Sequence, residues 1–264
     1  MIHSLSDLAR ATPVLGASLK RADEDRRELA RLLRDKKAGY CHCCRQETLF
    51  ESIGDWDRDD YLCGLCFSIP RQRHLQMILD TYFPGWENAS LHESSPSNDF
   101  LSRYSSAYSD SQFFEDAAPG TRVGGVRNEN LEKMTFDDNT FDLFITQDVF
   151  EHVLNPQVAA KEILRVLKPG GAHIFTTPKH RTIEMSRTRV ERVEGKIEDL
   201  FVPEFHGNPV GDGRSLVTWD YGRDFEELFT AWSGGTTVTY VTRDRSLGLE
   251  GEFLEVFVNR KPSR

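Results

Sequence analysis

The chain has 264 residues, of which 38% are hydrophobic and 28% are charged, and these proportions exclude a mainly disordered protein. The chain has 33 Lys and Arg and 42 Asp and Glu, which gives a formal net charge of -9. The surface as a whole should therefore repel nucleic acid. No stretch approaches the ~20 apolar residues that span a bilayer, and the first ten residues lack a signal-peptide core. We therefore expect a cytoplasmic protein without a membrane partner.

Residues 17–35 carry four leucines among mixed charges, without Gly or Pro, and this pattern predicts a charged helix with a narrow apolar stripe. The helix belongs to an N-terminal helical segment, residues 1–38. It has two readings, a solvated helix docked on the protein or a helix that forms a homodimer.

Residues 39–75 contain all the cysteines of the chain. Cys41 and Cys44 form one C-x2-C pair, Cys63 and Cys66 form a second, and 18 residues separate the pairs. This spacing is typical of a structural Zn²⁺ site in which four thiolates close the coordination shell. Cys43 is a spare thiol, and it or His42 remains an alternative ligand. The predicted element is a zinc-ribbon-like knuckle.

From residue 76 onward the pattern is that of an α/β unit. A short helix over 74–83 ends at Pro84-Gly85, a strand follows at 89–93, and a polar stretch leads to a turn at Pro119-Gly120. Next come a buried strand over 141–147, a helix over 156–167 that ends at Pro169-Gly170-Gly171, and a second buried strand over 172–177. Strand, helix and strand in this order form a right-handed parallel crossover.

Residues 126–178 resemble class I methyltransferases of the group that includes the ubiquinone and menaquinone methyltransferases. The likeness is carried by TFDDNTFDLFIT, DVFEHV and EILRVLKPGG. CGLCFSIPRQR and LHESSPS also resemble a subset of these enzymes with a cysteine knuckle before the first strand. The resemblance implies a Rossmann-like, mostly parallel seven-stranded sheet with flanking helices over residues 76–264, and S-adenosyl-L-methionine at the carboxyl ends of the strands.

The resemblance also implies a set of cofactor-binding residues. The first strand of the family normally ends in an acidic residue and a Gly-x-Gly turn, whereas this chain has no glycine there. The remaining positions are implied for the ribose, the adenine ring and the sulfonium, and Asn130 also reads as an ordinary turn residue. The implied residues are Glu93, Ser94 and Ser95 in the first turn, Asp110 and Ser111 for the ribose, Asn130 and Leu131 for the adenine, and Thr146, Gln147 and Asp148 near the sulfonium.

Methyl transfer to a hydroxyl requires a base with a pKa near neutrality, and histidine is the side chain that fits. The candidates are His152, His180 and His206. His206 lies in residues 181–218, a stretch too long for an ordinary connection, which we expect to be an insertion or lid over the acceptor.

Three functions are compatible with the sequence. The first is a methyltransferase for a small-molecule or sugar acceptor. The second is an RNA methyltransferase that docks through the zinc knob; the net charge disfavours it, although Arg71, Arg73 and His74 predict a small basic patch. The third, favoured by the missing glycine turn, is a catalytically silent partner protein.

Overall fold

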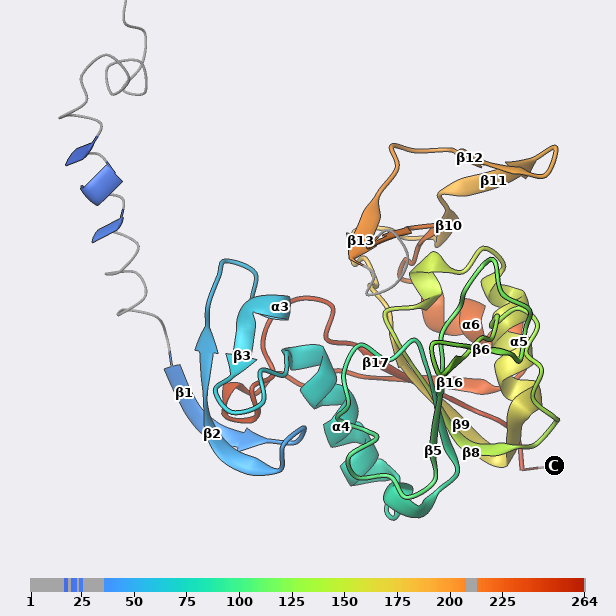
Figure 1. Cartoon of the computed structure of the whole chain (residues 1–264), viewed down its shortest axis with the longest axis horizontal. Helices are drawn as coiled ribbons and strands as arrows, with labels where there is room; N and C mark the ends of the chain where they lie inside the picture. Colours follow the sequence, from blue (N-terminus) through green and yellow to red (C-terminus); the bar gives the residue numbers. More distant parts are fainter. Residues whose placement is uncertain (1–16, 19, 23, 26–35, 208–212, 264) are drawn as a thin grey trace, which may run out of the picture.

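The computed structural model describes residues 17–18, 20–22, 24–25, 36–207 and 213–263 (Figure 1). The described residues between 17 and 25 are helical and exposed. The rest of the helix predicted over 17–35, including Leu29, Leu32 and Leu33, lies outside the described residues, so the homodimer stays a prediction.

The cysteine segment folds as a three-stranded antiparallel sheet, which we call the knob (residues 36–69). Its strands are β1 (Lys36–Cys41), β2 (Gln46–Ser52) and β3 (Tyr61–Cys63), with the short helix α3 (Asp57–Asp60) before the last strand. Each C-x2-C pair sits in a tight turn at the end of a strand. Arg45 and Phe67, the residues that follow the two pairs, both have left-handed backbones, with φ of 56° and 58°. The two turns therefore have the same construction.

A six-stranded sheet forms the centre of the second unit. Its strand order is β16-β17-β9-β8-β4-β5, in which β9, β8, β4 and β5 run parallel and β17 and β16 are antiparallel to their neighbours. The strands are β4 (Leu91–Ser94), β5 (Tyr108–Ser111), β8 (Phe141–Gln147), β9 (Leu167–Thr176), β16 (Thr236–Tyr240) and β17 (Val256–Arg260). This is a Rossmann-like α/β fold, as predicted.

Helices cover both faces of this sheet because the side chains of buried strands alternate between two apolar layers. On one face Leu143, Ile145 and Ile174 pack against α4 (Pro70–Tyr82) and the turn η1 (Trp86–Asn88). On the other face Phe144 and Phe175 pack against α5 (Pro156–Val166) and α6 (Phe225–Ser233). None of the described helices combines the length and apolar content needed to cross a bilayer.

The sheet has six strands in the described residues, one fewer than the seven expected. The missing strand would lie beside β5, where β6 (Arg122–Val123) and β7 (Val126–Arg127) form a small hairpin instead. Gly124 and Gly125 both have positive φ and form the turn between β6 and β7. Beyond the hairpin, Asn128 forms an isolated parallel bridge with Gln112, the residue after β5. This single bridge is too short to form a seventh strand of the sheet.

The predicted parallel crossover is confirmed, but its last strand, β9, begins at Leu167, five residues before the predicted start at 172, and includes Pro169-Gly170-Gly171. β8 spans 141–147 as expected, and α5 ends one residue before the predicted 167. Helix α4 begins at Pro70 rather than at residue 74, because Pro70 occupies the first helical position and the Gln72 side chain accepts a hydrogen bond from the Ile69 N–H (3.0 Å). The helix thus crosses the domain boundary that we placed after residue 75.

The described part of the stretch over 181–218, which we expected to be an insertion or lid, forms short hairpins that project beyond the sheet (Figure 1). β10 (Arg187–Thr188) pairs with β15 (Trp219–Asp220) at its base, and β11 (Val190–Val193) pairs with β12 (Lys196–Asp199). β13 (Phe205–Gly207) pairs with β14 (Arg214–Leu216). Two further 3-10 turns, η2 (Phe150–His152) and η3 (Arg245–Leu247), follow β8 and precede β17.

Arg73 joins the knob to the second unit. Its fully buried guanidinium lies 4.8 Å from the Phe50 ring and donates hydrogen bonds to the carbonyl oxygens of Tyr61 and Gly248, both at 2.6 Å. His74 is also fully buried, and Arg71 pairs with Asp148 and is mostly covered. The predicted basic patch is therefore wrong, because these side chains bind internal partners.

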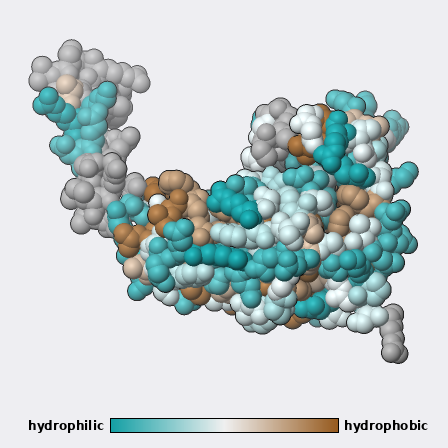
Figure 2. Space-filling view, turned by 60° about the horizontal axis from the view of Figure 1, so that its bottom comes forward, coloured by the Kyte–Doolittle hydropathy of each residue, from teal (hydrophilic) through white to brown (hydrophobic). Residues whose placement is uncertain are grey.

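Several large apolar side chains are exposed on the surface of the knob. Brown, apolar side chains gather at the end of the molecule where the knob lies (Figure 2). Leu49, Leu65 and Phe67 are 53%, 53% and 69% exposed. The knob therefore owes its internal order to the Arg73 contacts and the cysteine cluster rather than to a large apolar core of its own.

We predict that Arg73→Ala lowers the free energy of unfolding by about 3 kcal/mol or more, because two buried carbonyls lose a charged donor and a cavity remains. Urea unfolding followed by circular dichroism measures it. Arg103→Ala is the matched control: Arg103 is 47% exposed, forms an ion pair with the exposed Asp99 and lies 5.4 Å from the Phe100 ring, so we expect a change within about 0.5 kcal/mol. Equal losses in the two variants would contradict this role.

Candidate cofactor and acceptor site

Glu93 is the penultimate residue of β4, at the carboxyl edge of the sheet, and is buried. The Tyr108 hydroxyl donates a hydrogen bond to one of its carboxylate oxygens and the Gln147 amide donates one to the other, each at 2.8 Å. Burial raises the pKa of Glu93 to about 7 against these two bonds. Gln147 Oε1 is buried and accepts no hydrogen bond. Each Glu93 oxygen thus has one donor, and the amide that holds Glu93 brings with it a buried acceptor that has none.

The turn after β4 keeps the backbone shape that the family usually obtains from glycine. Ser95 has a φ of 58°, in the left-handed region, and its N–H donates to the Ser111 carbonyl at 2.7 Å. Ser94 is buried in β4 between Ser111 and Thr146. A small residue at position 95 is the only sign of this conformation in the sequence, and a glycine search misses it.

Of the two predicted ribose residues, Asp110 lies with Glu93 and Ser111 does not. Asp110 is half-buried and is the register partner of Glu93 in the parallel pair, so both side chains share one face of the sheet. Ser111 projects to the other face, where its hydroxyl lies 3.0 Å from Nε2 of His92. Burial lowers the pKa of His92 to about 3, which keeps that ring neutral.

The predicted adenine residues have structural partners. The Asn130 side-chain oxygen accepts a hydrogen bond from the Glu132 N–H at 2.8 Å, which is the turn contact of the alternative reading. Leu131 is buried in the core cluster beneath α5. Their contact with adenine stays a prediction.

The end of β8 directs its residues to three different places. Thr146 is fully buried, and its hydroxyl lies 3.0 Å from Nε2 of His173 on β9. Gln147 holds Glu93, and Asp148 turns away with a φ of 51°. Of the residues predicted near the sulfonium, only Gln147 therefore contacts Glu93.

Asp148 links the knob to the edge of the sheet. Arg58 of α3 and Arg71 of α4 both bind its carboxylate, the second with 3.0 Å between Nε and Oδ2, and the Thr176 hydroxyl donates to Oδ1 at 2.8 Å. Burial alone would raise the pKa of Asp148, but Arg71 and Arg58 lower it. Sequence reasoning missed both arginines, because nothing in their local pattern points to a residue far along the chain.

The structure brings together two of the three predicted histidines. The rings of His152 on η2 and His206 on β13 lie 5.1 Å apart between centroids. Nδ1 of His152 lies 2.8 Å from the Leu216 carbonyl oxygen. His180 lies apart from them, with its ring 5.3 Å from that of Phe253.

Glu151, which sequence reasoning missed, lies between the two histidines. Its Oε1 is 3.8 Å from Nε2 of His152 and 3.6 Å from Nδ1 of His206, and it raises the pKa of His206. Its Oε2 accepts a hydrogen bond from the Thr177 hydroxyl at 3.0 Å. We call Glu151, His152 and His206 the EHH cluster. The sequence signal was present, since Glu151 precedes His152 directly.

The four predicted zinc ligands converge in the knob. The sulfur atoms of Cys41, Cys44, Cys63 and Cys66 all lie within 4.8 Å of one another, with 3.7 Å between Cys41 and Cys66 and 3.9 Å between Cys44 and Cys63. A tetrahedron with Zn–S bonds of ~2.3 Å has edges of about 3.8 Å. The donor set therefore fits Zn²⁺.

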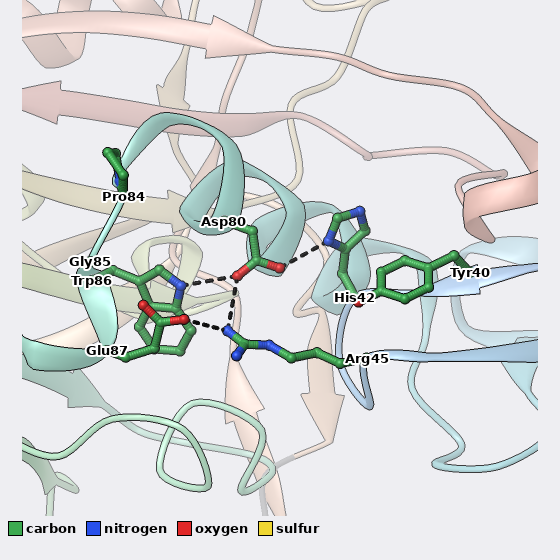
Figure 3. Close-up of a pocket in the computed structure, with 8 residues that line it drawn as sticks. All are labelled: Tyr40, His42, Arg45, Asp80, Pro84, Gly85, Trp86 and Glu87. Atoms are coloured by element: carbon green, nitrogen blue, oxygen red, sulfur yellow. Dashed lines mark hydrogen bonds and ion pairs between the residues drawn. The ribbon is translucent and has the colours of Figure 1, made fainter.

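Neither alternative ligand belongs to this group. Cys43 is buried but lies outside the set of four. His42 turns to Asp80 instead, with 2.9 Å between Nδ1 and Oδ2. Asp80 also accepts hydrogen bonds from Arg45 and Trp86, and these side chains line a separate cavity of ≈ 520 Å³ between the knob and α4 (Figure 3).

Comparison with known proteins gives a consistent assignment. Residues 96–175 match the family model described as "Methyltransferase domain". No curated protein sequence shows a significant match.

Three solved structures illustrate the similarity. An S-adenosylmethionine-dependent methyltransferase from Mesorhizobium loti is 15% identical, with 71% of this chain and 98% of that chain covered and a TM-score of 0.46. The 1,6-didemethyltoxoflavin-N1-methyltransferase of Burkholderia thailandensis, solved with S-adenosylhomocysteine, is 12% identical, with coverage of 73% and 78% and a TM-score of 0.45. A methyltransferase from Methanosarcina mazei is 16% identical, with coverage of 71% and 98% and a TM-score of 0.42.

The family match covers the turn after β4, strands β5 and β8, helix α5 and most of β9. These are the elements that build the carboxyl edge with Glu93. The resemblance seen in the sequence is thus confirmed over residues 96–175, which match the methyltransferase domain family.

Proposed function

We propose that the enzyme methylates a hydroxyl group of a small-molecule or sugar acceptor, and that it binds S-adenosyl-L-methionine against Glu93. The observation that supports this proposal is the pair of buried acceptors, Glu93 and Gln147 Oε1, at the carboxyl ends of parallel strands. The ammonium group of the cofactor is a donor of the right charge for them. Asp110, on the neighbouring strand, has a carboxylate suited to the ribose hydroxyls.

When bound, the cofactor supplies a methyl group already activated by its sulfonium, so the protein has to position the acceptor and take up its proton. The EHH cluster is the group that we assign to the acceptor. It follows directly after β8, and its third member comes from the insertion, which we propose as the lid. His180 lies apart from the cluster and is the weakest of the three predicted bases.

The proposed acceptor class follows from where the described basic side chains beside the second cysteine pair lie. An RNA methyltransferase needs basic side chains that contact phosphates, and the only basic patch predicted from the sequence is internal. A small molecule or a sugar needs no such surface. We also place the enzyme in the cytoplasm, because none of the five cysteines forms a disulfide, and unoxidised cysteines persist in a reducing compartment.

We further propose that the knob holds one structural Zn²⁺ through Cys41, Cys44, Cys63 and Cys66. Four sulfur ligands leave no open position for a substrate or a water. The metal would hold together the two turns that contain the C-x2-C pairs. Because α3 directly precedes β3, which ends at Cys63, the metal would also help to hold Arg58 of α3 near the sheet edge.

Binding of S-adenosylhomocysteine should depend on pH through Glu93. The cofactor ammonium favours the ionised carboxylate, and with a pKa of about 7 the free protein must lose a proton to bind below that pH. We expect calorimetric affinity to rise from pH 6 to about pH 8 and then to level off. Glu93→Gln should bind roughly tenfold to a hundredfold more weakly at pH 8, with a flat profile.

Glu87→Gln is the control, because Glu87 is partly exposed on η1 and pairs with Arg45 instead. It should keep the wild-type profile. An affinity for S-adenosylhomocysteine that is independent of pH in the wild type, or unchanged in Glu93→Gln, would exclude Glu93 as the ammonium ligand.

The zinc proposal predicts about one zinc per chain after a brief wash with chelator, measured by elemental analysis. Cys63→Ser should lose most of this zinc and several degrees of melting temperature, since structural zinc contributes folding energy. Cys43→Ser should keep the metal. Zinc loss in Cys43→Ser, or its retention in Cys63→Ser, would overturn the ligand set.

A further inference from the structure

We infer that the EHH cluster is a second metal site, which binds a divalent first-row transition ion through Glu151, His152 and His206. Three ligand atoms converge there, Oε1 of Glu151 and one ring nitrogen from each histidine, all within 4.8 Å of one another. The separations of 3.8 Å and 3.6 Å from Oε1 are too long for hydrogen bonds. The three groups therefore surround a common point without bonding to each other.

The hydrogen bonds of His152 orient its ring as a metal ligand. Nδ1 lies 2.8 Å from the Leu216 carbonyl oxygen, which can only accept, so Nδ1 carries the proton and Nε2 presents its lone pair to the cluster. A metal-bound histidine has this arrangement, with its outer N–H bound to a carbonyl or a carboxylate. In His206, Nδ1 is the ring nitrogen toward Glu151, while Nε2 lies 3.5 Å from the Glu204 carboxylate.

Glu151 supplies an independent sign that a ligand is missing. Its side chain is 1% exposed and its Oε1 has no hydrogen-bond partner, whereas Oε2 is held by Thr177. The Glu151 carbonyl also accepts from the backbone N–H of Thr218 at 2.7 Å, so the residue is fixed in place. Leaving a buried carboxylate oxygen unpaired is costly, and a cation next to it removes that cost.

The donor set selects the class of metal. Two imidazoles and one carboxylate suit Zn²⁺, Fe²⁺ or Co²⁺ better than Mg²⁺ or Ca²⁺, which prefer oxygen ligands. With metal–ligand bonds of ~2.1 Å, neighbouring ligand atoms lie about 3.0 to 3.4 Å apart. The two separations from Glu151 Oε1 exceed this by a few tenths of an ångström, which small side-chain shifts can close. Three protein ligands leave at least one position open.

The role of the ion rests on the proposed function. An acceptor hydroxyl bound at the open position becomes more acidic and releases its proton to water, because the ion stabilises the alkoxide. The oxygen lone pair then forms the new bond to the methyl carbon, while the carbon–sulfur bond breaks and its electron pair stays on sulfur. His152 and His206 would thus be ligands rather than the base.

The test is a titration of the zinc-loaded, chelator-washed protein with Co²⁺, followed by visible absorption. We expect one added equivalent with d–d bands and no thiolate charge-transfer band, which distinguishes this site from the cysteines. His206→Ala and Glu151→Gln should each weaken binding at least tenfold. His180→Ala, a histidine outside the cluster, should bind as the wild type does.

His206 lies on a partly exposed hairpin, and Glu151→Gln keeps the size of the side chain, so at least one variant should fold. No Co²⁺ uptake at millimolar concentration, a thiolate charge-transfer band, or equal binding in a folded His206→Ala variant would overturn the site. No substrate enters this assay. Failure of methyl transfer with an intact Co²⁺ signal would therefore count against the proposed function alone.

Discussion

The ion pairs of Asp148 hold the two units of this protein together at the carboxyl edge of the sheet. Asp148 follows β8 directly, in a left-handed conformation, and Arg58 and Arg71 reach it from the knob and from α4. Losing the carboxylate would leave two largely buried guanidinium groups to share the single carboxylate of Asp59, a costly arrangement. The position of the knob is thereby tied to the end of β8, and the neighbouring Gln147 keeps its contact with Glu93.

The sheet topology explains why so many polar residues meet at one edge. Parallel strands place all their carboxyl ends together, so Glu93 of β4, Asp110 of β5 and Gln147 of β8 become neighbours. The EHH cluster follows the same strand end and is completed by the insertion. Methyl donor and acceptor would thus be held by residues that the central crossover positions, while α4, α5 and α6 bury the apolar faces behind them.

The sequence predicts what depends on local pattern. β8, α5 and the convergence of the four cysteines follow from apolar runs, proline and glycine positions and C-x2-C spacing. The rest depends on tertiary contact. Arg58 and Asp148, which form an ion pair, are 90 residues apart in the sequence. Serine has no preference for positive φ, so the sequence does not indicate the backbone conformation of Ser95. Basic residues 71, 73 and 74 suggest an exposed patch in the sequence, but in the fold helix α4 places them toward the interior. Glu151 is not among the predicted site residues, because only histidines fit a base with a pKa near neutrality.

The most direct test of this account is a crystal structure of the zinc-loaded enzyme with S-adenosylhomocysteine. The account predicts that the amino group of the ligand lies within hydrogen-bond distance of Glu93 and of Gln147 Oε1, with the ribose hydroxyls on Asp110. A ligand bound away from Glu93, for example in the cavity between the knob and α4, would contradict it.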